Sequence, residues 1–156
     1  MATIKSEYRN GAKNMPTPSG PEVVTVYTEV ALTALQVANG NIVELFELPA
    51  GCVPVGYAIN NDDLDTGGTA MAADFGILSG SAISTAAADG GDEWIDGTTA
   101  LTGAALTLHT ASRAAFDVLK SVQKSAANRT VAIVFMGAPT TAAAGGIGVE
   151  FSYRAA

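Results

Sequence analysis

The 156-residue chain has a mass of 15.7 kDa, with 48% hydrophobic and 15% charged residues. This length fits one domain, and disorder is excluded because disordered chains combine few apolar residues with high charge. No apolar run approaches the ~18 residues that a membrane span needs, so we expect no membrane partner.

Charge is segregated along the chain. Residues 1–13 carry a net charge of +2, residues 14–112 carry −12 without a single Lys or Arg, and residues 113–156 carry +3. A net-negative body repels phosphate backbones, so nucleic acid is not an expected partner. The first ten residues have no apolar signal core, so we do not expect export.

Residues 1–22 are predicted to form an extended N-terminal arm. They lack hydrophobic periodicity, and the three prolines within residues 16–21 forbid a helix. The arm either contacts a neighbouring protein surface or is a solvated tail. Residues 23–156 are then the folded domain, and we expect a chain lacking residues 1–20 to stay folded but to assemble less well.

The domain opens with strands. Residues 23–32 alternate apolar and polar side chains, which predicts a half-buried strand. Two apolar runs, 41–48 and 52–59, flank Pro49-Ala50-Gly51, and a Pro-x-Gly turn between such runs predicts a hairpin. Pro54 cannot donate a ladder hydrogen bond, so its strand should lie at an edge or carry a bulge there.

The middle of the chain is less regular. Residues 69–78 are predicted to form a strand, and residues 81–98 a loop with one helical turn, in which Trp94 packs into the core or a subunit contact. Residues 99–128 stay open, because the spacing of Ala115, Val118, Leu119 and Val122 is helical while Ala114 to Leu119 would also suit a strand.

The C-terminal part is clearly β. Residues 131–136 are apolar on both faces, which indicates a central strand, and residues 147–153 alternate strictly. Seven or eight short strands of this kind predict an all-β fold, a jelly-roll-like β-sandwich or barrel.

Candidate catalytic and metal-binding residues are sparse. His109 is the only histidine and Cys52 the only cysteine, so a transition-metal site, a hydrolytic triad and an intrachain disulfide are unsupported. Cys52 is expected to be a buried, unreactive side chain. We predict no cofactor and no enzymatic activity.

Two acidic segments allow alternatives. The corner with Asp62, Asp63 and Asp65 would suit Ca²⁺, but asparagine and aspartate at a corner are equally explained by turns that their side chains stabilise. A second carboxylate set consists of Asp89, Asp92, Glu93 and Asp96. Paired carboxylates hydrolyse glycosides only in a cleft walled by aromatic side chains, and the chain has few to spare.

From Asn41 onward, the order of segments resembles the capsid decoration, or cement, proteins of tailed bacteriophages. The segments that carry the resemblance are Glu47-Leu-Pro-Ala-Gly51, Asn61-Asp-Asp-Leu-Asp-Thr66, Asp74-Phe-Gly-Ile77, Ala88-Asp-Gly-Gly-Asp-Glu-Trp-Ile-Asp-Gly97, Arg129-Thr-Val-Ala-Ile133 and Gly148-Val-Glu-Phe-Ser-Tyr153. They span about three quarters of the chain. The arm has no counterpart in this pattern.

The resemblance implies a structural virion protein on the capsid surface, made in the host cytoplasm. Such a protein binds the major capsid protein, stabilises capsomer junctions and self-associates, as a trimer rather than a dimer. For the shell contact we select the arm, with Lys5, Tyr8, Arg9 and Lys13, and the basic C-terminal third. The alternative is a virion-displayed adhesion or carbohydrate-binding module, which exposed aromatic side chains around Trp94 would favour.

Overall fold

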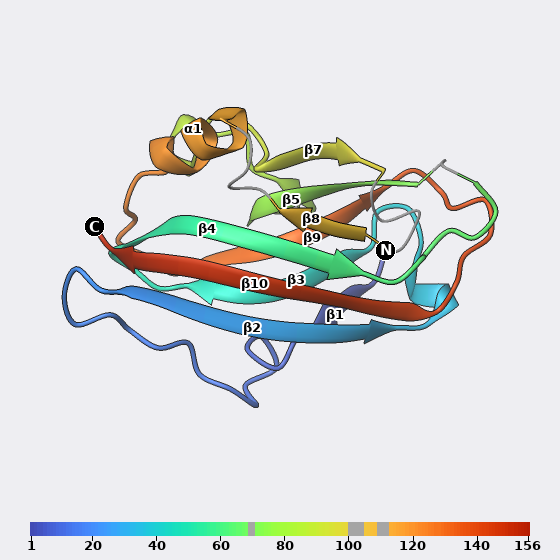
Figure 1. Ribbon diagram of the computed structural model, residues 1–156, viewed down its shortest axis with the longest axis horizontal. Helices are drawn as coiled ribbons and strands as arrows, with labels where there is room; N and C mark the ends of the chain where they lie inside the picture. The colour runs from blue at the N-terminus through green and yellow to red at the C-terminus, as the bar shows by residue number, and fades with distance from the viewer. Residues whose placement is uncertain (69–70, 100–104, 109–112) are drawn as a thin grey trace.

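Two β-sheets face each other in the computed structural model, which describes residues 1–68, 71–99, 105–108 and 113–156 (Figure 1). One sheet has the strand order β1-β3-β9-β5-β6, with β7 also paired to β5, and the other has the order β2-β10-β4-β8. Neighbouring strands are antiparallel except β1 and β3, which run parallel.

The strand bounds, in chain order, are β1 Thr3–Lys5, β2 Val23–Leu32, β3 Ile42–Leu48, β4 Cys52–Asn61, β5 Ala72–Ser79, β6 Ala82–Ile83, β7 Ile95–Thr98, β8 Ala105–Leu108, β9 Arg129–Met136 and β10 Gly145–Ala155. The helical elements are the 3₁₀ turns η1 Ala34–Gln36 and η2 Ala87–Asp89 and the helix α1 Arg113–Ser121. No helix in the described part of the chain is long and apolar enough to cross a membrane.

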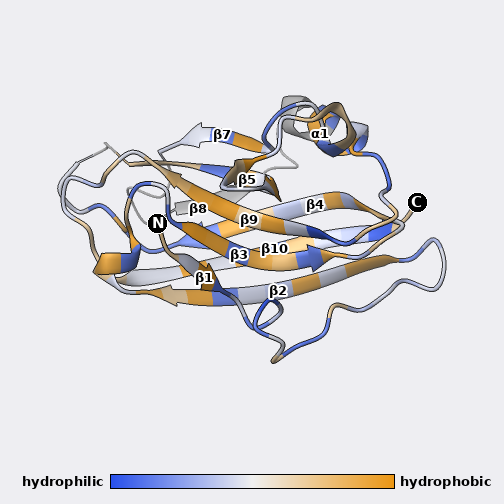
Figure 2. Ribbon diagram, turned by 180° about the vertical axis from the view of Figure 1, so that it is seen from behind, coloured by the Kyte–Doolittle hydropathy of each residue, from blue (hydrophilic) through white to orange (hydrophobic). Residues whose placement is uncertain are grey.

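The clearest sequence patterns are confirmed. Along β2, side chains alternate between water and the interior, with Val26, Thr28, Val30 and Leu32 buried. In β10 the buried side chains Ile147, Val149, Phe151 and Tyr153 follow the same period. The apolar strand β9 lies between β3 and β5, and Figure 2 shows β9 and β3 as largely hydrophobic ribbons in the sheet on that side.

Aromatic side chains connect the two sheets across the core. Phe46 on β3 stacks on Phe151 on β10 with ring centroids 5.4 Å apart, and Trp94 stacks on the same Phe151 at 5.9 Å. Phe75 on β5 meets Tyr57 on β4 at 4.7 Å. Because these pairs join one sheet to the other, the two layers share a single core.

The predicted hairpin over residues 41–59 is wrong. Both strands form, but β3 pairs with β1 and β9 while β4 pairs with β10 and β8, so Pro49-Ala50-Gly51 crosses from one sheet to the other. The turn is held by other partners: Ala50 donates to Asn128 Oδ1 at 2.9 Å and Gly51 to the Ser125 carbonyl at 2.8 Å. The local Pro-x-Gly pattern therefore predicts that the chain turns between β3 and β4, but it does not predict which strands these two pair with.

Pro54 behaves as expected. It pairs with Tyr153 where the β4–β10 register shifts after Ser152, and β8 pairs only with Ala58–Asn61 of β4. The strand is thus bulged at the proline, and among the residues that the structure describes no strand pairs with its other edge there.

The remaining middle segments differ in part from expectation. The predicted helical turn within residues 81–98 is η2, but this stretch also forms the short strands β6 and β7. In residues 99–128 the helical alternative holds over α1, which buries Leu119, and Val122 just after it is also buried. His109 lies outside the described residues.

Candidate interaction surface

The N-terminal segment lies against the sandwich. β1 pairs with β3 from Thr3 opposite Ile42 to Lys5 opposite Glu44. Ser6 is buried; its N–H donates to the Glu44 carbonyl at 2.9 Å, and its hydroxyl donates to the Leu45 carbonyl. A short edge strand and a buried serine thus tie the start of the chain to the six-stranded sheet.

Residues 6–16 cover the side of the core between the β1 edge and the β2 edge. The Tyr8 ring lies 5.5 Å from the Phe46 ring, and Met15 packs on the same buried cluster. The Tyr153 hydroxyl, on the opposite sheet, donates to the Pro16 carbonyl. Burial raises the pKa of Tyr153 to about 12, so it stays a donor at any physiological pH. We call residues 3–16, which include β1, the N-terminal strap, and Figure 1 shows residues 6–16 passing beside β2.

The four residues that we selected for shell contact have different surroundings in the strap. Arg9 is 19% exposed and committed to the protein itself, with Nε 3.2 Å from Glu44 and Nη1 2.7 Å from Glu47. Tyr8 packs on the core. The two lysines, Lys5 and Lys13, keep about half of their side chains exposed.

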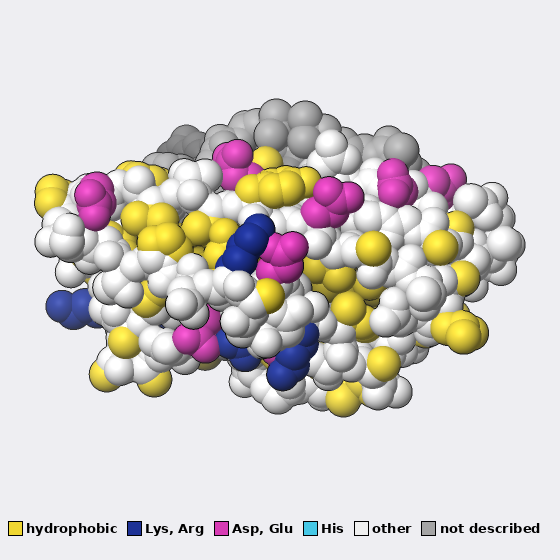
Figure 3. Space-filling view, turned by 90° about the horizontal axis from the view of Figure 1, so that it is seen from below, with side chains coloured by type: hydrophobic (Ala, Val, Ile, Leu, Met, Phe, Trp, Pro, Cys, Tyr) yellow, Lys and Arg dark blue, Asp and Glu magenta, His cyan; other side chains and the backbone are white. Residues whose placement is uncertain are grey.

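Lys13 forms an ion pair with Glu7 and stands 5.8 Å above the Tyr8 ring. The hydrogen bond that Lys13 donates to the Glu7 carboxylate, together with the negative charge of that carboxylate, raises the pKa of Lys13, so the amine stays protonated. Seen from below (Figure 3), basic and acidic side chains lie side by side in the middle of this face, with hydrophobic side chains around them. This is a mixed surface rather than a basic patch.

An open groove of about 360 Å³ runs along the strap. Its lining residues are Tyr8, Gly11, Lys13, Asn14, Met15, Thr17, Glu47, Pro49 and Asn128. Donors, acceptors and one aromatic ring line it together, a mixture that suits a segment of another protein. The groove could not be predicted from the sequence, because Glu47 and Asn128 are far from the strap along the chain.

The acidic corner at residues 60–68 is explained by backbone hydrogen bonds. Asp65 is buried and accepts from the N–H groups of Thr140 at 3.0 Å and Thr141 at 2.8 Å, which lower its pKa. Asp62 accepts from the Gly146 N–H at 2.7 Å, and Asp63 from the Asp65 N–H at 3.2 Å. Of the two alternatives for this corner, the turn explanation accounts for all three carboxylates.

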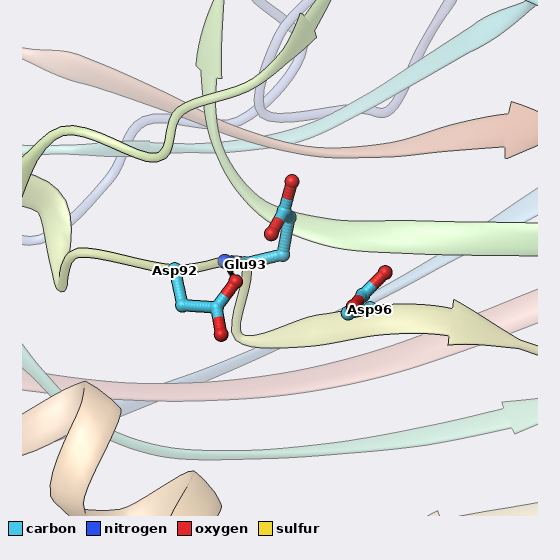
Figure 4. Close-up of side chains that lie close together, drawn as sticks. All are labelled: Asp92, Glu93 and Asp96. Atoms are coloured by element: carbon cyan, nitrogen blue, oxygen red, sulfur yellow. Dashed lines mark hydrogen bonds between the residues drawn. The ribbon is translucent and has the colours of Figure 1, made fainter.

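The second acidic set divides in the structure. Asp89 pairs with Arg129 at 2.9 Å and accepts from the Ser84 hydroxyl at 2.7 Å, away from the others. Asp92, Glu93 and Asp96 stay together, with one carboxylate oxygen of each within 4.8 Å of the others (Figure 4). A hydrogen bond with Asp92 and the nearby negative charges raise the pKa of Glu93. Two of the three are exposed, and solvated acids gather in this way without a ligand.

Trp94 and Cys52 are interior residues, as predicted. Trp94 is 3% exposed, stacks on Tyr57 at 5.9 Å and donates from Nε1 to the Asp89 carbonyl at 3.2 Å. Cys52 is 2% exposed, and burial raises the pKa of its thiol. The thiol is therefore held in its unreactive form.

Comparisons with known proteins place the fold. No family model and no curated protein matches the chain. Among solved structures, the chain is similar to a chain of the capsid of Ralstonia phage GP4, with 28% identity, a TM-score of 0.79, and 99% of this chain and 98% of that chain covered. A chain of the cyanophage Pam1 capsid asymmetric unit is similar at 21% identity and a TM-score of 0.55, over 92% and 94% of the two chains. The fold is an all-β, jelly-roll-like sandwich of the kind found in these phage capsids.

Proposed function

We propose that this chain is a structural protein of a bacteriophage virion that binds the outside of the capsid and stabilises the junctions between capsomers. The observation that carries the proposal is the nearly end-to-end correspondence with a chain of the Ralstonia phage GP4 capsid, at 28% identity. The expected partners are the major capsid protein and further copies of the chain, as a trimer rather than a dimer. The resemblance in the order of sequence segments supports the finer assignment to the capsid surface.

The physics of the fold supports this role. A rigid sandwich presents fixed surfaces, and a stable protein contact buries about 1,600 Å² in total. Many identical copies on one shell multiply a modest contact into a large resistance to expansion or rupture. The strap offers one such surface, with the exposed Lys5 on its strand and Lys13 in the lining of a groove.

We also propose that the chain is not an enzyme. The carboxylates that a hydrolase would need accept hydrogen bonds from the protein itself and so have a structural role, at Asp62, Asp65 and Asp89. The alternative of an adhesion module loses its main support, because Trp94 is in the core and cannot stack on a sugar.

Binding to shells tests the proposal directly. Purified protein is mixed with expanded capsid shells that lack it, and co-sedimentation and the rupture temperature of the shells are measured. We expect saturable binding and a higher rupture temperature. Failure to bind, or binding with no gain in thermal or mechanical resistance, would contradict the proposal.

Two variants test the contact residues within the same experiment. Lys5→Ala with Lys13→Ala removes the exposed positive charges of the strap, and we expect weaker shell binding with little change in the unfolding temperature. Arg9→Ala is the matched comparison, because its ion pairs lie within the protein and its loss should cost about 1 kcal/mol of stability. Unchanged binding by the double variant would remove the strap lysines from the contact.

A further inference from the structure

One end of the sandwich is free of charged side chains over two loops. Residues 30–43 and 131–149 contain no Asp, Glu, Lys or Arg. The fold brings their loops together: the Gly40 N–H donates to the Phe135 carbonyl at 2.8 Å, and the Gly137 N–H to Asn39 Oδ1 at 3.0 Å. We call residues 33–41 and 136–139 the uncharged loop pair.

The loop pair presents two large apolar side chains to water. Leu35 is 92% exposed and Met136 is 44% exposed. A leucine this exposed gives up the favourable free energy of burying its apolar side chain, which a partner surface would recover.

Leu35 is held in place by a well-anchored turn. In η1 the Gln36 side-chain oxygen accepts from the Thr33 N–H at 2.9 Å, and the Gln36 carbonyl accepts from Asn41 Nδ2 at 3.0 Å. The residues that flank the turn, Leu32 and Val37, are buried in the core. A backbone fixed in this way has little conformational entropy left to lose when Leu35 docks, which favours its use as an interface anchor.

The absence of charge indicates which partner the loop pair suits. Around a rotation axis each residue near the axis meets its own copy, so a charge there faces a like charge. The chain has a net charge of −7, and most of its surface would repel a second copy. The loop pair avoids this repulsion. The exposed Asp62 lies on the neighbouring corner, which would form the rim of the contact, and the rim of an interface is usually polar.

The other exposed apolar patch does not share this property. Val23 and Tyr27 on β2 each line a surface hollow, one with Glu150 and the other with Glu29. Two copies meeting there about an axis would bring these carboxylates together, at a cost.

We propose that the uncharged loop pair is the contact through which copies of this chain associate, with Leu35 as the central anchor. The proposal rests on the self-association that belongs to the proposed function, and it names the surface. The strap then stays available for the shell.

Sedimentation velocity of the purified full chain tests the proposal over a range of concentrations. Leu35→Glu puts a like charge at the contact and should raise the dissociation constant of the oligomer at least tenfold, as should Met136→Glu. Val23→Glu is the matched control: it adds the same charge at an apolar side chain that is 52% exposed, at the far end of β2, and should leave the oligomer intact. Circular dichroism and the unfolding temperature verify the fold of each variant, and Leu35→Ser serves if the glutamate variant is destabilised.

The results of this experiment distinguish a failure of the loop-pair contact from a failure of the proposed virion role. A wild-type monomer that still binds shells would overturn the loop-pair contact and leave the virion role standing. An oligomer that survives Leu35→Glu would also overturn it. If that variant stayed oligomeric but lost shell binding, the loop pair would belong to the shell contact instead.

Discussion

Thr28 shows how one buried hydroxyl limits stability. It is 2% exposed on the inner face of β2, between Val26 and Val30, and its Oγ1 has no hydrogen-bond partner among the described residues. A buried hydroxyl without a partner costs about 1–3 kcal/mol. The sequence pattern placed Thr28 on the apolar face, but only the three-dimensional packing shows that no acceptor reaches it.

We therefore expect Thr28→Val to stabilise the protein by about 1 kcal/mol, because the methyl group removes the unpaired hydroxyl at nearly constant volume. For a chain of this size the unfolding temperature should rise by roughly 2–4 °C in differential scanning calorimetry. Thr25→Val on the same strand is the control. Thr25 is exposed and its hydroxyl lies 2.7 Å from the Ser152 hydroxyl, so its replacement should bring no gain. Equal gains from both changes would mean that strand propensity, not the buried hydroxyl, is responsible.

Asp65 gives a pH dependence with a definite sign. The N–H groups of Thr140 and Thr141 lower its pKa in the folded state, so its stabilisation is fully present above the unfolded pKa of about 3.9. It is lost as the pH falls through the lower folded value. Below about pH 4 the wild type should lose stability more steeply than Asp65→Asn, whose amide does not titrate.

Urea unfolding at several pH values measures this difference. Asp65→Asn should also be less stable than the wild type at pH 7, because an amide oxygen accepts more weakly than a carboxylate. Glu150→Gln, which removes an exposed charge from β10, is the matched control for loss of charge. Parallel pH curves for the wild type and Asp65→Asn would contradict the assignment.

Among the elements, the N-terminal strap differs most from what the sequence predicted. Prolines and missing periodicity suggested an arm separate from the domain, but β1 pairs with β3 and the strap covers Phe46. Its basic residues also have acidic partners within the protein, from Lys5 and Arg9 at Glu44 to Lys13 at Glu7. Part of the charge segregation along the sequence is thus neutralised inside the folded chain.

Deleting residues 1–20 should accordingly lower stability by about 3–5 kcal/mol, through lost burial of Tyr8 and Met15 and lost hydrogen bonds to β3. Guanidinium unfolding of the truncated chain measures the loss. The Lys5→Ala and Lys13→Ala double variant, which keeps the strap but removes its exposed positive charges, should unfold near the wild-type midpoint. If the truncated chain also unfolds there, the division into an arm of residues 1–22 and a domain of residues 23–156 is correct.

The strands also show which parts of the fold could be predicted from the sequence. β2 and β10 could be predicted residue by residue, because a period of two follows directly from one buried face. The partner of β3 could not, since strand pairing depends on contacts far apart in the chain and the Pro49-Ala50-Gly51 turn suits a hairpin and a crossing between sheets equally well.

The candidate interaction surface could likewise be predicted only in part from the sequence. Lys5 and Lys13 could be selected from charge alone, whereas the use of Arg9 at Glu44 and Glu47 depends on a parallel pairing of three residues. Such a short strand carries too little pattern to be recognised. The uncharged loop pair is visible in the sequence only as two segments without charge, and the fold is needed to bring them together.

At the scale of the whole molecule, the shared core predicts a single unfolding transition. Trp94 belongs to the connection between β6 and β7 of one sheet but stacks on Phe151 and Tyr57 of the other. Its fluorescence therefore reports contact between the two layers, while far-UV circular dichroism reports the strands themselves. Because single domains of this size usually unfold cooperatively, the two signals should give the same midpoint in urea.

A second side chain sharpens this test. Arg129 on β9 joins the same connection to the six-stranded sheet through Asp89, and its guanidinium also donates to the Cys52 carbonyl at 3.3 Å. Arg129→Ala should lower the common midpoint while the two signals still coincide, because removing one partner of a largely buried ion pair leaves Asp89 unpaired. If the fluorescence change came first in either protein, the β6–β7 connection would be a separate unit resting on the sandwich, and the two sheets would not share one cooperative core.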